Sequence, residues 1–178
     1  MLKDKLNELY RGGQKAWMMA PAEKFALEAC ILEGGPGDYV EIGVNRGGSL
    51  VFACLLKKAF DQAGKCYGIE ASIGYKPEIE KLASGLLVDV NVVYKPSDPW
   101  PGKCMEPVVA FIDGDHYGDM PVRDWNNLKD RTKRFILFHD CNEGSDVERA
   151  VENAKADTSW TFVGKSGCMA VFERCGSS

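Results

Sequence analysis

The sequence contains only two histidines, His116 and His139, among its 178 residues. It has seven cysteines but no C-x-x-C pair, and this odd, scattered set favours reduced thiols over disulfides or a zinc site. No basic run is long enough to follow a phosphate backbone, so nucleic acid is not expected as a partner. No segment has the apolar length of a membrane span or signal peptide, so we expect a cytoplasmic protein without a membrane partner.

A common phosphate-binding pattern is also missing. A dinucleotide fingerprint needs glycine at the first, third and sixth positions counted from Gly43, and the third position is Asn45. The Asn45 side chain would stand where a pyrophosphate must come close to the backbone. This departure argues against a dinucleotide bound through its phosphates.

Apolar and charged residues, at 45% and 27%, suit a soluble globule, and the length suits one domain. From about residue 38, short strand-like runs alternate with helical segments, which is typical of a parallel sheet with helices on both faces. The expected strands cover 38–43, 65–70, 88–94, 107–113, 135–140, 159–164 and 167–173. The expected helices cover 49–63, 76–85, 120–132 and 146–156. The last two runs flank a polar turn at Lys165-Ser166, so they predict an antiparallel hairpin.

We therefore predict a doubly wound α/β sheet of seven strands, mostly parallel, with an antiparallel C-terminal hairpin strand. Residues 1–34 are expected to form a helical preface within the same domain, and residues 35–178 the main ligand-binding part. A lid over the site would have to come from this preface or from a second subunit of a homo-oligomer.

The strongest local signal is a strand that breaks into glycines and then opens a helix, over 40–50. Backbone N–H groups at such a turn can approach a ligand. Glu41 precedes Gly43 by two residues, and a carboxylate there can accept from an ammonium or a loop amide; Glu70 ends the second run and can accept from both hydroxyls of a ribose. Together they predict a nucleoside that carries an amino acid and no phosphate. The alternative is a tight turn before a helix, with no ligand.

Five short motifs are spread along the chain, and the resemblance that they carry runs from about residue 21 to residue 174. They are Glu41-Ile-Gly-Val-Asn-Arg-Gly-Gly-Ser, Gly68-Ile-Glu-Ala, Phe111-Ile-Asp-Gly-Asp-His-Tyr, Phe138-His-Asp and Gly167-Cys-Met-Ala-Val-Phe. With them the chain resembles the Rossmann-like class I S-adenosylmethionine-dependent methyltransferases. Within that class it is similar to small-molecule and sugar O-methyltransferases, the macrocin O-methyltransferase and cephalosporin hydroxylase-like group.

The resemblance implies S-adenosylmethionine as cofactor and a small molecule as methyl acceptor. It places the methionine part near the glycine turn, the ribose on Glu70 and the adenine near Ser97-Asp98. The implied cofactor-binding residues are Glu41, Gly43, Asn45, Gly47, Ser49, Glu70, Ser97, Asp98 and Asp113. The implied ligands of a divalent ion are Asp113, His139 and Asp140.

Catalysis is expected from Asp113, His116 and His139, at the ends of two adjacent predicted strands. Carboxylates suit Mg2+, which would hold and acidify a substrate hydroxyl while a nearby group removes its proton. The milder alternative is a metal-free histidine base. Asp115 is expected to make a turn, and Asp124 to cap or pair locally.

Two other functions stay open from the sequence. One is a module that binds S-adenosylmethionine without catalysis. The other is a nicotinamide-dependent oxidoreductase, which Asn45 and the closing hairpin oppose.

Overall fold

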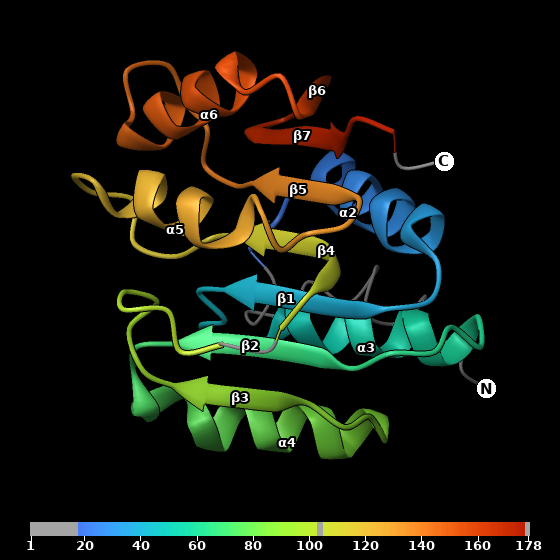
Figure 1. The fold of residues 1–178 in the computed structure, drawn as a ribbon. Helices are drawn as coiled ribbons and strands as arrows, with labels where there is room; N and C mark the ends of the chain where they lie inside the picture. The colour runs from blue at the N-terminus through green and yellow to red at the C-terminus, as the bar shows by residue number, and fades with distance from the viewer. Residues whose placement is uncertain (1–17, 103–104, 177–178) are drawn as a thin grey trace.

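Seven strands form a single sheet in the computed structural model, which describes residues 18–102 and 105–176 (Figure 1). The strands are β1 (Asp38–Ile42), β2 (Cys66–Glu70), β3 (Asn91–Tyr94), β4 (Pro107–Ile112), β5 (Phe135–Phe138), β6 (Trp160–Ser166) and β7 (Met169–Arg174). The helices are α2 (Pro21–Gly34), α3 (Gly48–Ala59), α4 (Lys76–Leu86), α5 (Met120–Leu128) and α6 (Asp146–Ala156). A short 3-10 turn (Ile73–Tyr75) precedes α4.

The strand order is β3-β2-β1-β4-β5-β7-β6. Strands β1 to β5 are parallel, and β7 is antiparallel to both of its neighbours, β5 and β6. This confirms the predicted Rossmann-like fold. The chain order reverses between β1 and β4, and in such sheets the crevice beyond the carboxyl ends of the strands at this switch point is where ligands bind.

Helices cover both faces of the sheet, and each face has its own core. On one face Leu27 of α2, Phe52 of α3 and Ile79 of α4 are fully buried against the sheet. On the other face Trp125 of α5 and Val151 of α6 are buried in the same way. Helix α2 also contacts α3, β4, β5 and β6, so the described part of the predicted preface packs onto the main body. Residues 1–17 of that preface lie outside the described residues.

Several boundaries differ from the sequence expectation: β3 begins at Asn91 and not at 88, and α5 ends at Leu128 and not at 132. Two others differ where the backbone takes a left-handed conformation. Helix α3 ends at Ala59 because Asp61 has φ +52°, which no α-helix accommodates. The hairpin turns at Gly167 (φ +62°) and not at Lys165-Ser166, so β6 continues to Ser166, which pairs with Met169. None of the described helices has the length and apolar character needed to cross a membrane.

Candidate functional site

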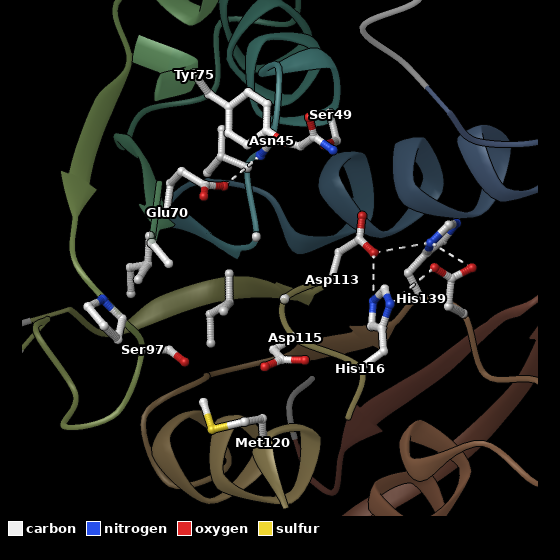
Figure 2. A pocket seen from close by; sticks show the side chains of 18 of the residues that line it. Asn45, Ser49, Glu70, Tyr75, Ser97, Asp113, Asp115, His116, Met120 and His139 are labelled. Carbon is white, nitrogen blue, oxygen red and sulfur yellow. Dashed lines mark hydrogen bonds and ion pairs between the residues drawn. The ribbon is translucent and has the colours of Figure 1, made fainter. Parts of the chain in front are cut away.

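A cavity of about 640 Å3 opens beyond the carboxyl ends of the strands, at the switch point between β1 and β4 (Figure 2). Its wall comes from the loops that follow β1, β2, β3, β4 and β5, together with Met18 and Met19 ahead of α2. The volume lies in the range typical of sites for small molecules and cofactors.

Glycine is required at the first turn of this wall. Gly43 follows β1 with φ +83°, and a Cβ atom there would lie 2.0 Å from the backbone oxygen of Asp113. The loops after β1 and β4 therefore touch at a point where no side chain fits. Asn45 (φ +48°) and Gly47 (φ +87°) also take left-handed backbone, and Gly47 then caps the start of α3.

Glu70 ends β2 on the wall of the cavity, with its carboxylate held by two backbone amides. Oε2 accepts from the N–H of Asn45 at 2.8 Å, and Oε1 accepts from the N–H of Ser72 at 2.8 Å. The dashed line in Figure 2 marks the contact with Asn45. A carboxylate has about four acceptor positions, so each oxygen keeps one for a ligand. Glu70 is thus fixed in place and still able to accept from two neighbouring hydroxyls.

Glu41 lies beneath the cavity rather than on its wall. Its side chain is fully buried and accepts from Tyr39 Oη and Ser49 Oγ, each at 2.7 Å. Burial raises the pKa of Glu41 to about 8 in spite of these two hydrogen bonds. Glu41 therefore does not reach the cavity, and the structure does not support the expected direct contact between Glu41 and a ligand ammonium. Instead Glu41 fixes Ser49, which does line the cavity.

Six of the nine implied cofactor-binding residues line the cavity: Gly43, Asn45, Ser49, Glu70, Ser97 and Asp113. The other three are Glu41, Gly47 and Asp98. Gly47 packs against Ile79, which would lie 3.1 Å from a Cβ atom at this position. Asp98 pairs with Arg123 at 2.5 Å and does not reach the wall.

All four implied catalytic and metal-binding residues, Asp113, His116, His139 and Asp140, line one end of the cavity. Asp113 Oδ1 lies 3.2 Å from His139 Nδ1 and 3.4 Å from His116 Nε2. Asp140 Oδ1 lies 3.5 Å from His139 Nδ1, and its Oδ2 lies 3.6 Å from His116 Nδ1. The ligand atoms of Asp113, His139 and Asp140 lie within 4.8 Å of one another, which is compact enough to hold one metal ion.

Two nitrogens of this cluster are buried without an aligned acceptor. His139 Nδ1 and His116 Nε2 both lack a hydrogen-bond partner among the described residues, although Asp113 is close enough to pair with each by charge. Buried polar atoms without partners are rare in folded proteins and point to a missing ligand or a functional role. The cluster is therefore chemically incomplete on its cavity side.

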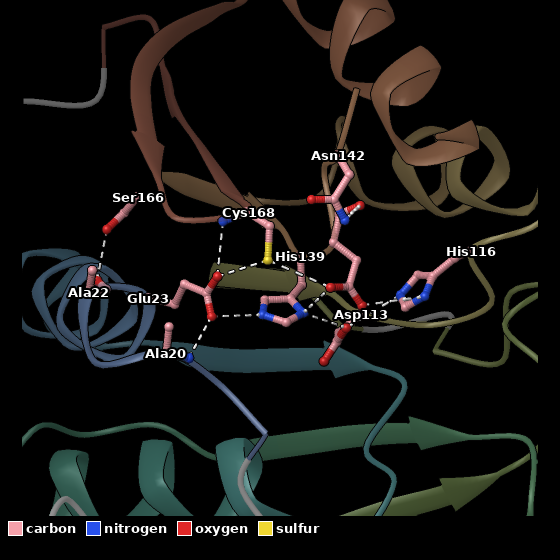
Figure 3. A network of polar contacts seen from close by, with 10 residues as sticks. Ala20, Ala22, Glu23, Asp113, His116, His139, Asn142, Ser166 and Cys168 are labelled. Carbon is pink, nitrogen blue, oxygen red and sulfur yellow. Dashed lines mark hydrogen bonds and ion pairs between the residues drawn. The ribbon is translucent and has the colours of Figure 1, made fainter. Parts of the chain in front are cut away.

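Glu23, at the start of α2, is the residue of this cluster that the sequence does not reveal. Its Oε2 lies 3.2 Å from His139 Nε2 and also accepts from the N–H of Ala20 at 2.7 Å (Figure 3). Its Oε1 accepts from the N–H and the thiol of Cys168, at 2.9 and 2.8 Å. The bond to Ala20 is an ordinary helix cap, and the sequence shows nothing that links this glutamate to a histidine 116 residues away.

The charges of the cluster support one another. Burial lowers the pKa of His139, but Asp113, Asp140 and Glu23 outweigh it and raise this pKa to about 9. Burial would raise the pKa of Glu23, but hydrogen bonds from Cys168, Ala20 and His139 lower it to about 2. The two histidines likewise hold the pKa of Asp113 below its usual range against the effect of burial. Glu23 and Asp113 are thus carboxylates, with a cationic His139 between them.

Two further aspartates differ from each other. Asp115 accepts from the N–H of Tyr117 at 3.1 Å, as expected for a turn. Asp124 of α5 is fully buried, and neither of its oxygens has a hydrogen-bond partner among the described residues. The expectation that it caps the helix or pairs locally is therefore wrong. Burial raises the pKa of Asp124 to about 6, although nearby Ser97 opposes the shift without a well-aligned bond.

The sequence matches no protein-family model and no curated protein. The fold is similar to that of the cofactor-bound Rv0187 from MTB (14% identity, TM-score 0.73, covering 97% of this chain and 89% of that one). It is also similar to an O-methyltransferase from Bacillus cereus in complex with SAH (14% identity, TM-score 0.70, covering 97% of this chain and 89% of that one). A third similar structure is the O-methyltransferase TomG from Streptomyces achromogenes with SAM (14% identity, TM-score 0.69, covering 98% of this chain and 90% of that one). At this identity the likeness shows the fold.

Proposed function

We propose that the protein transfers the methyl group of S-adenosylmethionine to a hydroxyl of a small molecule, such as a sugar or a secondary metabolite. The observation that carries the proposal is that one cavity joins a fixed, half-satisfied carboxylate, Glu70, to an incomplete cluster around Asp113. Similar folds described as O-methyltransferases with SAM or SAH support the choice of cofactor. This cofactor carries a good leaving group, so alignment supplies much of the rate.

The cofactor would lie across the loops after β1 and β2. Glu70 would accept from the two ribose hydroxyls with the acceptor positions that its backbone bonds leave free. Ser49 and the amides of the glycine turn would hold the methionine part, and Ser97 and Met120, which line the cavity, would flank the adenine. The methyl group would then point toward Asp113.

The acceptor hydroxyl would lie at the end of the cavity formed by Asp113, His116, His139 and Asp140. The hydroxyl oxygen attacks the methyl carbon, the bond from that carbon to sulfur breaks, and the thioether leaves with the electron pair. We assign the removal of the hydroxyl proton to His116, because His139 is tied to Glu23 while His116 is only half-buried and reaches the cavity. Asp113 beside His116 raises the pKa of this imidazole, which makes it a stronger base.

A divalent ion fits this end of the cavity. Asp113, His139 and Asp140 would hold it, and the unpartnered Nδ1 of His139 is the observation that favours it. When bound, such an ion lowers the pKa of a hydroxyl that it contacts.

Calorimetry tests the cofactor assignment without knowledge of the acceptor. We expect S-adenosylhomocysteine to bind with one-to-one stoichiometry and NAD to give no heat, whereas the reverse result would identify an oxidoreductase. Transfer of a labelled methyl group to a panel of hydroxylated small molecules then separates an enzyme from a module that only binds. Binding without transfer to any acceptor, with Asp113→Ala and His139→Ala silent in the native pathway, would favour the module.

A further inference from the structure

The imidazole of His139 is used on both sides. Nε2 faces Glu23 Oε2 at 3.2 Å (Figure 3). Nδ1 lies 3.2 Å from Asp113 Oδ1 and 3.5 Å from Asp140 Oδ1. His139 is only 6% exposed, and its Nδ1 has no aligned partner among the described residues. Without an ion the cationic ring carries a proton on both nitrogens. An ion that binds at Nδ1 takes the place of the proton there, while Nε2 keeps its N–H toward Glu23, and this is how histidine ligates metals.

Glu23 is held so firmly that it sets the direction of this ring. Besides His139 it accepts from Ala20 N, Cys168 N and Cys168 Sγ, donors that come from the start of α2 and from the hairpin turn before β7. Glu23 as a whole is 3% exposed. Its position therefore depends on two segments that are far apart in the sequence, and rotation would break several bonds at once.

The spacing on the Nδ1 side suits a six-coordinate ion. With bonds of about 2.1 Å, neighbouring donor atoms of an octahedral shell lie about 3.0 Å apart. The distances from His139 Nδ1 to the Asp113 and Asp140 oxygens, 3.2 and 3.5 Å, need only a small contraction. The same three residues line the cavity, so the remaining positions of an ion would face the ligand space.

A second compact set, Glu23, His139 and Cys168, does not compete with it. Its ligand atoms also lie within 4.8 Å of one another. However, both Glu23 oxygens already accept hydrogen bonds, and the Cys168 thiol donates to one of them. Because these groups satisfy each other, the incomplete side of His139 is the one toward Asp113.

We infer that Glu23 is a positioning residue that aims His139 Nδ1 at Asp113 and Asp140, and that the resulting site selects a nitrogen-preferring transition ion such as Co2+ over Mg2+. Oxygen-only sets suit Mg2+, whereas an imidazole nitrogen favours transition ions. A carboxylate behind a metal-bound histidine fixes its tautomer and raises its basicity. The inference deepens the proposed function, on which it rests for the role of the ion.

Direct ion binding tests it without methyl donor or acceptor. Chelator-treated protein is titrated with CoCl2, MnCl2 and MgCl2 by calorimetry, in the wild type, Glu23→Gln, His139→Gln and Glu33→Gln. Glu33→Gln is the matched control, since Glu33 lies exposed at the other end of the same helix. We expect Glu23→Gln to weaken Co2+ binding by roughly 10–100-fold and Glu33→Gln to leave it unchanged.

His139→Gln separates nitrogen from oxygen ligation, because glutamine is uncharged and can donate to Glu23 but offers an ion only oxygen. Its ratio of Co2+ to Mg2+ affinity should fall by about tenfold or more. Wild-type affinity for Mg2+ equal to that for Co2+, or a Glu23→Gln variant that binds Co2+ like the wild type, would overturn the inference.

Proton NMR of the Co2+-loaded wild type needs no variant and so does not depend on how well one folds. It should show one strongly shifted, exchangeable imidazole N–H, the Nε2–H that faces Glu23. Absence of this signal would contradict ligation through Nδ1. Binding of S-adenosylhomocysteine, measured separately, tells the two proposals apart. If it binds and no ion does, only the inference fails; if ions bind and it does not, the proposed function fails.

Discussion

The two ends of the cavity are built in different ways. At the cofactor end, formed by the loop from Gly43 to Ser49 and by Glu70, two backbone amides hold the Glu70 carboxylate, and the hydroxyls of Tyr39 and Ser49 hold Glu41 beneath the cavity. At the acceptor end, formed by Asp113, His116, His139 and Asp140, side chains face side chains, and two ring nitrogens have no aligned partner among the described residues.

The difference separates recognition from chemistry. Groups already fixed by the backbone lose little freedom when a ligand binds, so the cofactor end is preorganised for affinity. Charged groups that are held in place and not fully paired interact with charge that develops during a reaction. Substitutions at the two ends should therefore change different measured quantities.

The largest expected effect is on the acceptor end. Asp113→Asn removes a carboxylate that contacts both histidines, so methyl transfer should fall by roughly 1,000-fold. Affinity for S-adenosylhomocysteine should stay close to that of the wild type, as measured by calorimetry. An equal loss of S-adenosylhomocysteine affinity and of methyl-transfer rate would contradict the proposal that the two ends of the cavity have separate roles.

Gly43→Ala adds a methyl group where the loop after β1 contacts the loop after β4. The new methyl group would meet the Asp113 carbonyl at 2.0 Å in a left-handed backbone, so we expect the free energy of unfolding to fall by about 3 kcal/mol. Gly85→Ala is the control, because helix α4 has open space there, and it should stabilise by about 0.5–1 kcal/mol in urea denaturation. A neutral Gly43→Ala would contradict the close approach.

Asp124 belongs to neither end, since it is buried and without aligned partners. Its pKa is about 6 in the folded protein against 3.8 for an ordinary aspartate, so the folded state favours the protonated form. The protonated Asp124 contributes its full share to the free energy of unfolding below pH 4, and this contribution is lost as the pH rises through about 6. Asp124→Asn should therefore gain up to about 2–3 kcal/mol relative to the wild type between pH 4 and pH 7.5.

Urea denaturation at several pH values measures this difference directly. A constant difference between Asp124→Asn and the wild type across the range would show that Asp124 carries no buried charge.

The smallest effect is expected at Glu70. Glu70→Gln keeps the volume but loses the charge that strengthens bonds to hydroxyls, so affinity for S-adenosylhomocysteine should fall by about tenfold. The rate at saturating S-adenosylmethionine should hardly change. A loss of rate with intact affinity would assign Glu70 to the acceptor end.

The sequence predicts the sheet and most of the cavity because both depend on local order. Strands that end on Gly43, Glu70, Asp113 or Asp140 bring these residues to one edge in any parallel sheet. The hairpin turn is misplaced by two residues, since Gly167 can take positive φ and ends the strand later than the polar pair suggests.

What the sequence misses depends on contacts between distant segments. Glu23 looks like a helix cap, and only packing of α2 against β5 brings it to His139. Glu41 looks like a ligand contact, but the inward face of β1 turns it toward Tyr39 and Ser49. Asp124 looks like a cap, but the helix face that carries it is buried.

A crystal structure with S-adenosylhomocysteine and Mn2+ tests the division of the cavity most directly. We predict the ribose hydroxyls within hydrogen-bond distance of Glu70, and an anomalous Mn2+ peak bound by Asp113, His139 Nδ1 and Asp140. A nucleoside placed at the acceptor end, or a fully occupied cavity whose His139 Nδ1 contacts no ion, would contradict this account.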